Sequence, residues 1–148
     1  MSKYWFDYVK SCYDLVVESE GNTSLILEHE VEAYVVHMMA RNFNRVNIGD
    51  NPVALQLLTA VNSNRTENIV AVADECLLIH SYPLKSHRWP TSTYFQEMGI
   101  TAYGLAGHMM EQHFIVASRV LSAIFNRQFD AVSLRSSWPQ FRNLVNLA

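Results

Sequence analysis

The sequence predicts an all-α protein: one domain over residues 1–148, folded as a single compact bundle of about six to seven helices. Two long intervals carry no proline, one before Pro52 and one between Pro90 and Pro139. Within both intervals apolar residues recur every three or four positions, the spacing of an amphipathic helix. The chain has only five glycines and four prolines, so we expect few turns and long elements.

Residues 2–19 and 24–44 form the first two predicted helices. An apolar stripe with helical spacing runs through residues 4–16. Gly21, Asn22 and Thr23 separate the two helices. The side chain of Asn22 or Thr23 can cap the second helix by accepting a backbone N–H.

Residues 52–62 and 65–81 form the next two predicted helices. Asp50 precedes Pro52, a typical helix start, because proline at the first helical position loses no hydrogen bond. Asn64 and Glu67 resemble a capping box for the second of these helices. That helix is apolar on nearly every side, which favours a place at the centre of the bundle. A buried strand is the alternative, but the length of the run and its acids favour a helix.

The second half of the chain begins with its longest connection and continues with helices. The predicted segments are the connection 82–92 and helices at 93–110, 112–127, 130–136 and 139–147. Thr93 and Gln96 have the spacing of a capping box, and Pro139 divides the last two pieces. Three glycines, at positions 99, 104 and 107, fall inside the predicted helix 93–110. We expect them to permit close approach of a neighbouring helix, with Ala102 and Ala106 on the same side.

The charge distribution is uneven along the chain. The net charge is −3. Residues 1–80 carry five basic and eleven acidic side chains, and residues 112–148 carry four arginines against Asp130 alone. We expect the C-terminal part to lie against the acidic half, or a homodimer contact of the same sign pattern; an anionic partner is the alternative. A nucleic-acid partner is not expected, because such modules concentrate basic charge.

Cysteine usage and the N-terminal residues predict a cytoplasmic protein. Cys12 and Cys76 are the only thiols, and two isolated cysteines do not form a disulfide framework. The first residues lack the pattern of a signal peptide. The longest charge-free stretch in the second half is too short to span a bilayer, so no membrane insertion is expected.

Four polar residues on the predicted helix 24–44 form one half of a candidate ligand site. Glu30, Tyr34, His37 and Arg41 have spacings of four, three and four, which places them on one face. A carboxylate, a phenol, an imidazole and a guanidinium can together bind an anion or transfer a proton. The alternative is a solvated face of paired charges, with His37 hydrogen-bonded in the interior.

Asp74, Cys76 and His80 on the predicted helix 65–81 form the other half of this candidate ligand site. A carboxylate in so apolar a helix needs a partner; we expect a C-terminal arginine beside Asp74 and expect Glu75 to face outward. Cys76 and His80 lie four residues apart, the spacing of a thiolate–imidazole pair. Packing in the core is the favoured interpretation of Cys76, because cysteine behaves as a small hydrophobe.

Metal, cofactor and catalytic motifs are not predicted. His108, Glu111 and His113 contain His-x-x-Glu but no Glu-x-x-His, the order that ferritin-like di-iron sites need. The two histidines diverge by about 140° around a helix. The methionines at helical spacing are interpreted as core filler. We therefore predict no catalytic residue, no metal and no cofactor.

The connection 82–92 is the predicted partner-binding segment. Lys85, His87, Arg88 and Trp89 lie between two prolines, which stiffen the segment and reduce the entropy lost on docking. Arginine and tryptophan dominate binding hot spots. The alternative is a crossover loop whose Trp89 packs into the core.

Three blocks of the sequence resemble an uncharacterised family of bacterial all-helical proteins. These blocks are residues 52–58, residues 74–78 ahead of Tyr82 and Pro83, and residues 94–103. The likeness covers residues 50–105. It departs from the family after Pro83, where this chain has residues 84–88 in place of an acid and a more arginine-rich loop. The resemblance implies a bacterial helical protein and transfers no activity.

These observations favour a non-catalytic protein–protein interaction module, an adaptor or regulator, alone or as a homodimer. The alternative is a small-molecule- or metal-binding bundle, an enzyme among its forms, whose site is lined by polar residues of the predicted helices 24–44 and 65–81. The observation that separates the two is whether Glu30, His37, Asp74 and His80 share a cavity.

Overall fold

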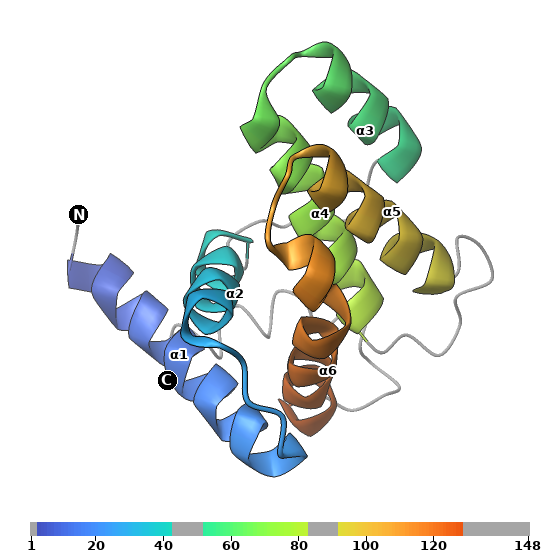
Figure 1. Cartoon of the computed structure of the whole chain (residues 1–148). Helices are drawn as coiled ribbons and strands as arrows, with labels where there is room; N and C mark the ends of the chain where they lie inside the picture. The colour runs from blue at the N-terminus through green and yellow to red at the C-terminus, as the bar shows by residue number, and fades with distance from the viewer. Residues whose placement is uncertain (1–2, 43–51, 83–91, 129–148) are drawn as a thin grey trace.

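The computed structural model describes residues 3–42, 52–82 and 92–128, and within these ranges the chain forms helices and no strand. The prediction of an all-α bundle is confirmed. The six helices are α1 (Lys3–Thr23), α2 (His29–Asn42), α3 (Val53–Asn62), α4 (Thr66–Ser81), α5 (Ser92–Leu105) and α6 (Met110–Gln128), shown in Figure 1. None of the helices in the described ranges is long and apolar enough to cross a membrane.

Helix α4 occupies the middle of the bundle, as its apolar sequence predicts. It packs against α3, α5 and α6, while α1 packs against α2 and α6. Residues 72–78 of α4 are all buried. Helix α3 lies at one end of the molecule, against α4 and α5 and far from α1 (Figure 1).

Two groups of buried apolar side chains hold these helices together. The larger group joins α1, α2, α4, α5 and α6 and includes the fully buried rings of Tyr103, Phe114 and Phe125. The smaller group fixes α3 to α4 and α5 and contains Val53, Ala60, Val72, Cys76 and Phe95. Burial of apolar area contributes roughly 25 cal/mol per Å², so α3 is held by far less packing energy than α4.

The boundary between α1 and α2 differs from the prediction. Helix α1 continues through Gly21 to Thr23, and α2 begins only at His29. Ser24 has a positive φ of 58°, which ends the first helix. The residues between the helices are held by Glu20, whose Oε2 accepts the N–H of Leu27 at 2.8 Å. Asn22 and Thr23 therefore lie inside α1 and do not cap α2.

The caps predicted for α3 and α4 are also different. Pro52 is the N-cap residue of α3 and not its first helical residue. The N-cap of α4 is Arg65, with no side-chain hydrogen bond, so the capping box of Asn64 and Glu67 is wrong. Asn64 instead adopts a positive φ of 57°. Ser63 stabilises this turn, since its hydroxyl accepts the N–H of Arg65 at 3.2 Å and donates to the carbonyl of Ala60.

Helix α5 ends five residues before the predicted boundary at residue 110. Its last residue is Leu105, and Gly107 follows in a turn with φ of +63°, a conformation that favours glycine. The prediction that Gly107 lies inside this helix is therefore wrong. Thr93 lies within the first turn of α5, which begins at Ser92, so it is not the cap.

The two glycines within α5 face side chains of α6 and α4. A Cβ on Gly99 would lie 2.5 Å from Cε2 of Phe114 and 3.0 Å from Cβ of Cys76, and a Cβ on Gly104 would meet the carboxylate of Glu111. Close approach of neighbouring helices thus explains Gly99. The predicted helical pieces 130–136 and 139–147 lie outside the described residues.

Candidate functional site

A buried carboxylate joins three helices in the centre of the molecule. Asp74 of α4 is 3% exposed, and its Oδ1 accepts hydrogen bonds from the hydroxyls of Tyr34 (2.5 Å) and Tyr103 (2.6 Å). Its Oδ2 forms an ion pair with Nη2 of Arg41 at 3.4 Å. Both oxygens of this carboxylate thus have partners, which is the condition for burying a charge at acceptable cost. We call these four residues together with His108 the Asp74 cluster.

The sequence positions these partners by simple helical spacing. Tyr34 and Arg41 lie seven residues apart on α2, two helical turns, and therefore on the same face. The guanidinium of Arg41 also lies 5.6 Å from the centre of the Tyr34 ring, a cation–π contact. Tyr103 reaches Asp74 from α5, which packs along α4. The cluster therefore bridges α2, α4 and α5.

Burial and hydrogen bonding oppose each other at Asp74. Burial raises the pKa of this carboxyl above its ordinary value, while the hydrogen bonds from Tyr103 and Tyr34 and the charge of Arg41 offset part of the increase. Burial, followed by the charge of Asp74, raises the pKa of both tyrosine hydroxyls well above the ordinary range. Both phenols therefore stay protonated and donate their hydrogen bonds at neutral pH.

His108 completes the cluster from the turn between α5 and α6. Its ring lies 4.6 Å from that of Tyr34 and 5.2 Å from that of Tyr103, measured between centres. Burial lowers the pKa of His108 below its usual value. The backbone N–H of Met110 donates to its Nδ1 at 3.1 Å, so the neutral ring carries its proton on Nε2.

The structure brings together three residues of the candidate ligand site and separates the others. Tyr34, Arg41 and Asp74 meet, whereas Glu30 and His37 are exposed. Nδ1–H of His37 donates to the carbonyl of Ala33, one turn earlier, at 2.8 Å. The interpretation of His37 as an interior histidine is therefore wrong.

Cys76 and His80 do not lie on the side of α4 that carries Asp74. Cys76 is fully buried in the small apolar group, where burial, with a smaller effect from the charge of Glu75, raises its pKa to about 12. The ring of His80 lies 5.7 Å from that of Phe114. A thiol of this kind is not a nucleophile at neutral pH, so the environment favours the packing interpretation of Cys76.

In the described part of the chain Asp74 pairs with Arg41 of α2. Arg119 is the C-terminal arginine whose side chain is described, and it is exposed on α6, so the expectation of a C-terminal arginine beside Asp74 stays a prediction. The expectation that Glu75 faces outward is wrong, because it is only 2% exposed on the side of α4 that α3 covers. Tyr103 and His108 are the members that sequence reasoning missed as partners of Asp74. Only the apolar context of Asp74, which demands buried donors, signalled that they exist.

Metal-ligating side chains do not gather in the described part of the chain. Within residues 3–42, 52–82 and 92–128, no three His, Cys, Asp or Glu side chains lie close enough to hold an ion. The Asp74 cluster itself offers one carboxylate and one imidazole, with an arginine beside them. Its donors fit hydrogen bonding and not metal coordination.

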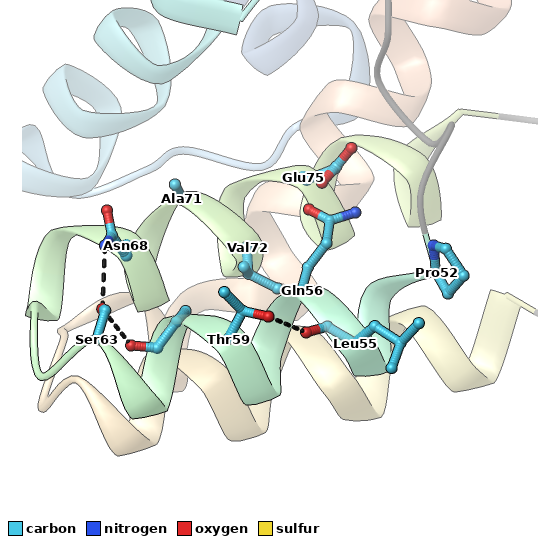
Figure 2. A pocket seen from close by; sticks show the side chains of 10 residues that line it. Pro52, Leu55, Gln56, Thr59, Ser63, Asn68, Ala71, Val72 and Glu75 are labelled. Carbon is cyan, nitrogen blue, oxygen red and sulfur yellow. Dashed lines mark hydrogen bonds between the residues drawn. The ribbon is translucent and has the colours of Figure 1, made fainter.

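A second feature is an open groove between α3 and α4. It has a volume of about 460 Å³, and Figure 2 shows it from close by. Gln56 extends from α3 toward the α4 side of the groove, where Glu75 lies (Figure 2). The remaining lining is mostly apolar or small, namely Pro52, Leu55, Thr59, Ala60, Ser63, Asn68, Ala71 and Val72. We call this feature the α3–α4 groove.

The side of α3 that faces away from the bundle exposes three large apolar side chains, beside the exposed polar residues Thr59 and Asn62. Leu55 is 62% exposed, Leu58 is 61% exposed and Val61 is 41% exposed. These three side chains are what we call the α3 outer face. No residue from Val53 to Asn62 carries a charge. Soluble helices normally present charged residues to water, so this face has the composition of a buried surface and lies in solvent.

Lys85, His87, Arg88 and Trp89, the predicted partner-binding residues, lie outside the described residues. Arg135 and Arg142 also lie outside them. The expectations about the basic connection and the C-terminal arginines therefore stay predictions.

Comparison with known proteins finds no relative of this chain. No family model matches the sequence, and neither the curated proteins nor the solved structures contain a match. The resemblance of residues 50–105 to a bacterial helical family stays a prediction.

Proposed function

We propose that this protein is a non-catalytic protein–protein interaction module, an adaptor or regulator, that docks its partner on the α3 outer face. The observation that carries the proposal is the exposure of Leu55 and Leu58 on a helix without charges. Contiguous exposed apolar side chains typically mark an interaction surface. A partner that covers them removes apolar area from water and gains about 25 cal/mol per Å².

The Asp74 cluster supports this choice because its carboxylate is not accessible to a substrate. Both oxygens of Asp74 already accept hydrogen bonds, and the carboxylate is almost fully shielded from solvent. A catalytic acid or base must reach the proton that it moves. The cluster therefore fits a structural role, in which a satisfied polar network fixes the packing of α2, α4 and α5.

The α3–α4 groove borders the α3 outer face and extends the docking surface. Leu55 belongs to both, since it lines the groove and is largely exposed. A side chain of the partner that enters the groove would lie near Gln56 and Glu75. Binding energy concentrates where an anchor side chain fills such a hollow.

Two further elements of the sequence prediction belong to this proposal. One is the binding of a protein partner by Lys85, His87, Arg88 and Trp89, which lie outside the described residues. The protein works in a reducing cytoplasm, which fits two free, buried thiols among the described residues.

The test places a photo-cross-linking amino acid at Leu58 and, as a control, at Ile26. Ile26 is 85% exposed in the segment between α1 and α2. In an extract of the producing cells we expect a defined cross-linked product from position 58 alone. With the captured partner purified, Leu58→Asp should weaken binding at least tenfold, or about 1.4 kcal/mol. Equal products from both positions, or an unchanged affinity, would contradict the proposal.

A second candidate function is favoured by the size of the groove. Its volume of about 460 Å³ falls within the range of small-molecule sites, about 300–1,000 Å³. The corresponding ligand is an apolar small molecule that packs against Leu55 and Val72. Ala71→Phe fills the groove from the exposed side of α4 and leaves the α3 outer face intact. Native mass spectrometry should then show a bound small molecule in the wild type alone, whereas a ligand-free wild type excludes this function.

A further inference from the structure

We infer that the occupant of the α3 outer face is a second copy of this chain, in a two-fold symmetric dimer whose α3 helices pack antiparallel about Leu58. This inference rests on the proposed function, because it names the partner that docks on the same face. Two-fold dimers are the commonest soluble oligomers, and they require a surface that is complementary to itself. The pattern of α3 meets that requirement.

The apolar positions of α3 are arranged symmetrically about Leu58. Leu55 precedes it by three residues, and Val61 follows it by three residues. In an antiparallel pair centred on Leu58, this residue meets its own copy, and Leu55 of each chain meets Val61 of the other. All three positions then pair apolar side chains with apolar side chains, which is how antiparallel helices bury a common face.

The charges of the chain also favour this face for a contact between copies. Each copy has a net charge of −3, so two copies repel each other over most approaches. A two-fold axis brings identical residues together, which is costly where they are charged. No residue from Val53 to Asn62 is charged, so no like charges of α3 face each other where two α3 helices meet.

The size of the face predicts a dimer that dissociates readily. The exposed parts of three side chains offer much less area than the roughly 800 Å² per partner of a standard interface. We therefore expect self-association at about 10–100 μM, which corresponds to about 5–7 kcal/mol. Since the net charges repel, added salt should strengthen the dimer.

Sedimentation velocity over a concentration series tests the inference. We expect the weight-average mass of the wild type to rise from that of one chain toward that of two. Leu58→Asp should remain a monomer at every concentration, while the control Ile26→Asp should associate like the wild type. Circular dichroism confirms that each variant is folded. A monomeric wild type throughout the series, or a dimer that persists in Leu58→Asp, overturns the inference.

Cysteine cross-linking tests the antiparallel arrangement about Leu58. Both native thiols are fully buried, with pKa values raised to about 12, so a short bismaleimide should react only with an introduced cysteine. Leu58→Cys should cross-link to its own copy. A mixture of Leu55→Cys and Val61→Cys should give more heterodimer than either variant gives homodimer. The reverse ranking overturns the arrangement.

The two experiments also separate this inference from the proposed function. If the wild type stays monomeric while Leu58 still cross-links to another protein in the extract, the second copy is excluded and the docking function stands. If Leu58 cross-links to nothing and the wild type is a monomer, both are excluded.

Discussion

The hydroxyl of Tyr103 donates a hydrogen bond to Oδ1 of Asp74 at 2.6 Å, across the interface between α4 and α5. Tyr103 is fully buried, and Asp74 is nearly so. The bond therefore lies in a low-dielectric environment, where a charge-assisted hydrogen bond is strong and its loss is costly. The stability of the bundle should depend on this pair more than on any exposed ion pair.

Replacement of Tyr103 by phenylalanine should destabilise the fold. The substitution keeps the ring and deletes the hydroxyl, so Asp74 loses one of its two phenol donors while remaining buried. We expect the free energy of unfolding to fall by about 1–3 kcal/mol, the cost of removing one partner of a buried polar group. Urea denaturation measures the difference. Tyr13→Phe on the exposed side of α1 is the control and should stay within about 0.5 kcal/mol.

The two cysteines should be inert in the native protein. Burial raises the pKa of Cys12 and Cys76 to about 12, so the thiolate that reacts with aromatic disulfides is nearly absent at pH 8. We expect no thiol release in native buffer and two thiols per chain in denaturant. Fast reaction of Cys76 alone in the native state would instead revive the cysteine–histidine interpretation of Cys76 and His80.

Most of the fold could be predicted from the sequence, because helix periodicity is a local property. The apolar run 69–79 indicates a central helix, and α4 covers it. The ends of helices were harder to predict, since their termination depends on backbone conformations that few residues disclose. Ser24 and Asn64 both adopt positive φ, and Asn64 was instead expected to be a cap.

The site could be predicted only in part, because the contacts that complete it are distant in sequence. Spacing along one helix places Tyr34 and Arg41 on one face, and the apolar context of Asp74 requires a partner. Nothing local shows that Arg41, 33 residues away, is such a partner. Tyr103 and His108 depend on how α5 and the turn after it pack on α4.

Stability should depend on pH through Glu20 at the end of α1. This residue is 7% exposed, and burial together with a hydrogen bond to the carboxyl of Glu32 raises its pKa from 4.5 to about 6. The folded state thus binds more protons than the unfolded state between these values. The stabilising contribution is fully present below about pH 4.5 and is lost as the pH rises through about 6.

Glu20→Gln isolates this contribution. A shift from 4.5 to about 6 corresponds to about 2 kcal/mol. Between pH 7.5 and pH 4.5 the wild type should therefore gain about 2 kcal/mol relative to the variant, measured by urea denaturation at each pH. A constant difference between the two proteins would show that the carboxyl of Glu20 does not bind an extra proton in the folded state.

Two glycine-to-alanine substitutions should change stability in opposite directions. A Cβ on Gly99 would lie 2.5 Å from Cε2 of the fully buried ring of Phe114, whereas a Cβ on Gly21 would meet nothing within 4 Å. Gly99→Ala forces the core to shift and should cost about 1–3 kcal/mol. Gly21→Ala lies within α1, so it should stabilise the fold by about 0.5–1 kcal/mol through helix propensity. Thermal and urea denaturation of both variants measure the two effects. Stabilisation by Gly99→Ala would mean that α4, α5 and α6 pack less closely around this glycine than its contacts indicate.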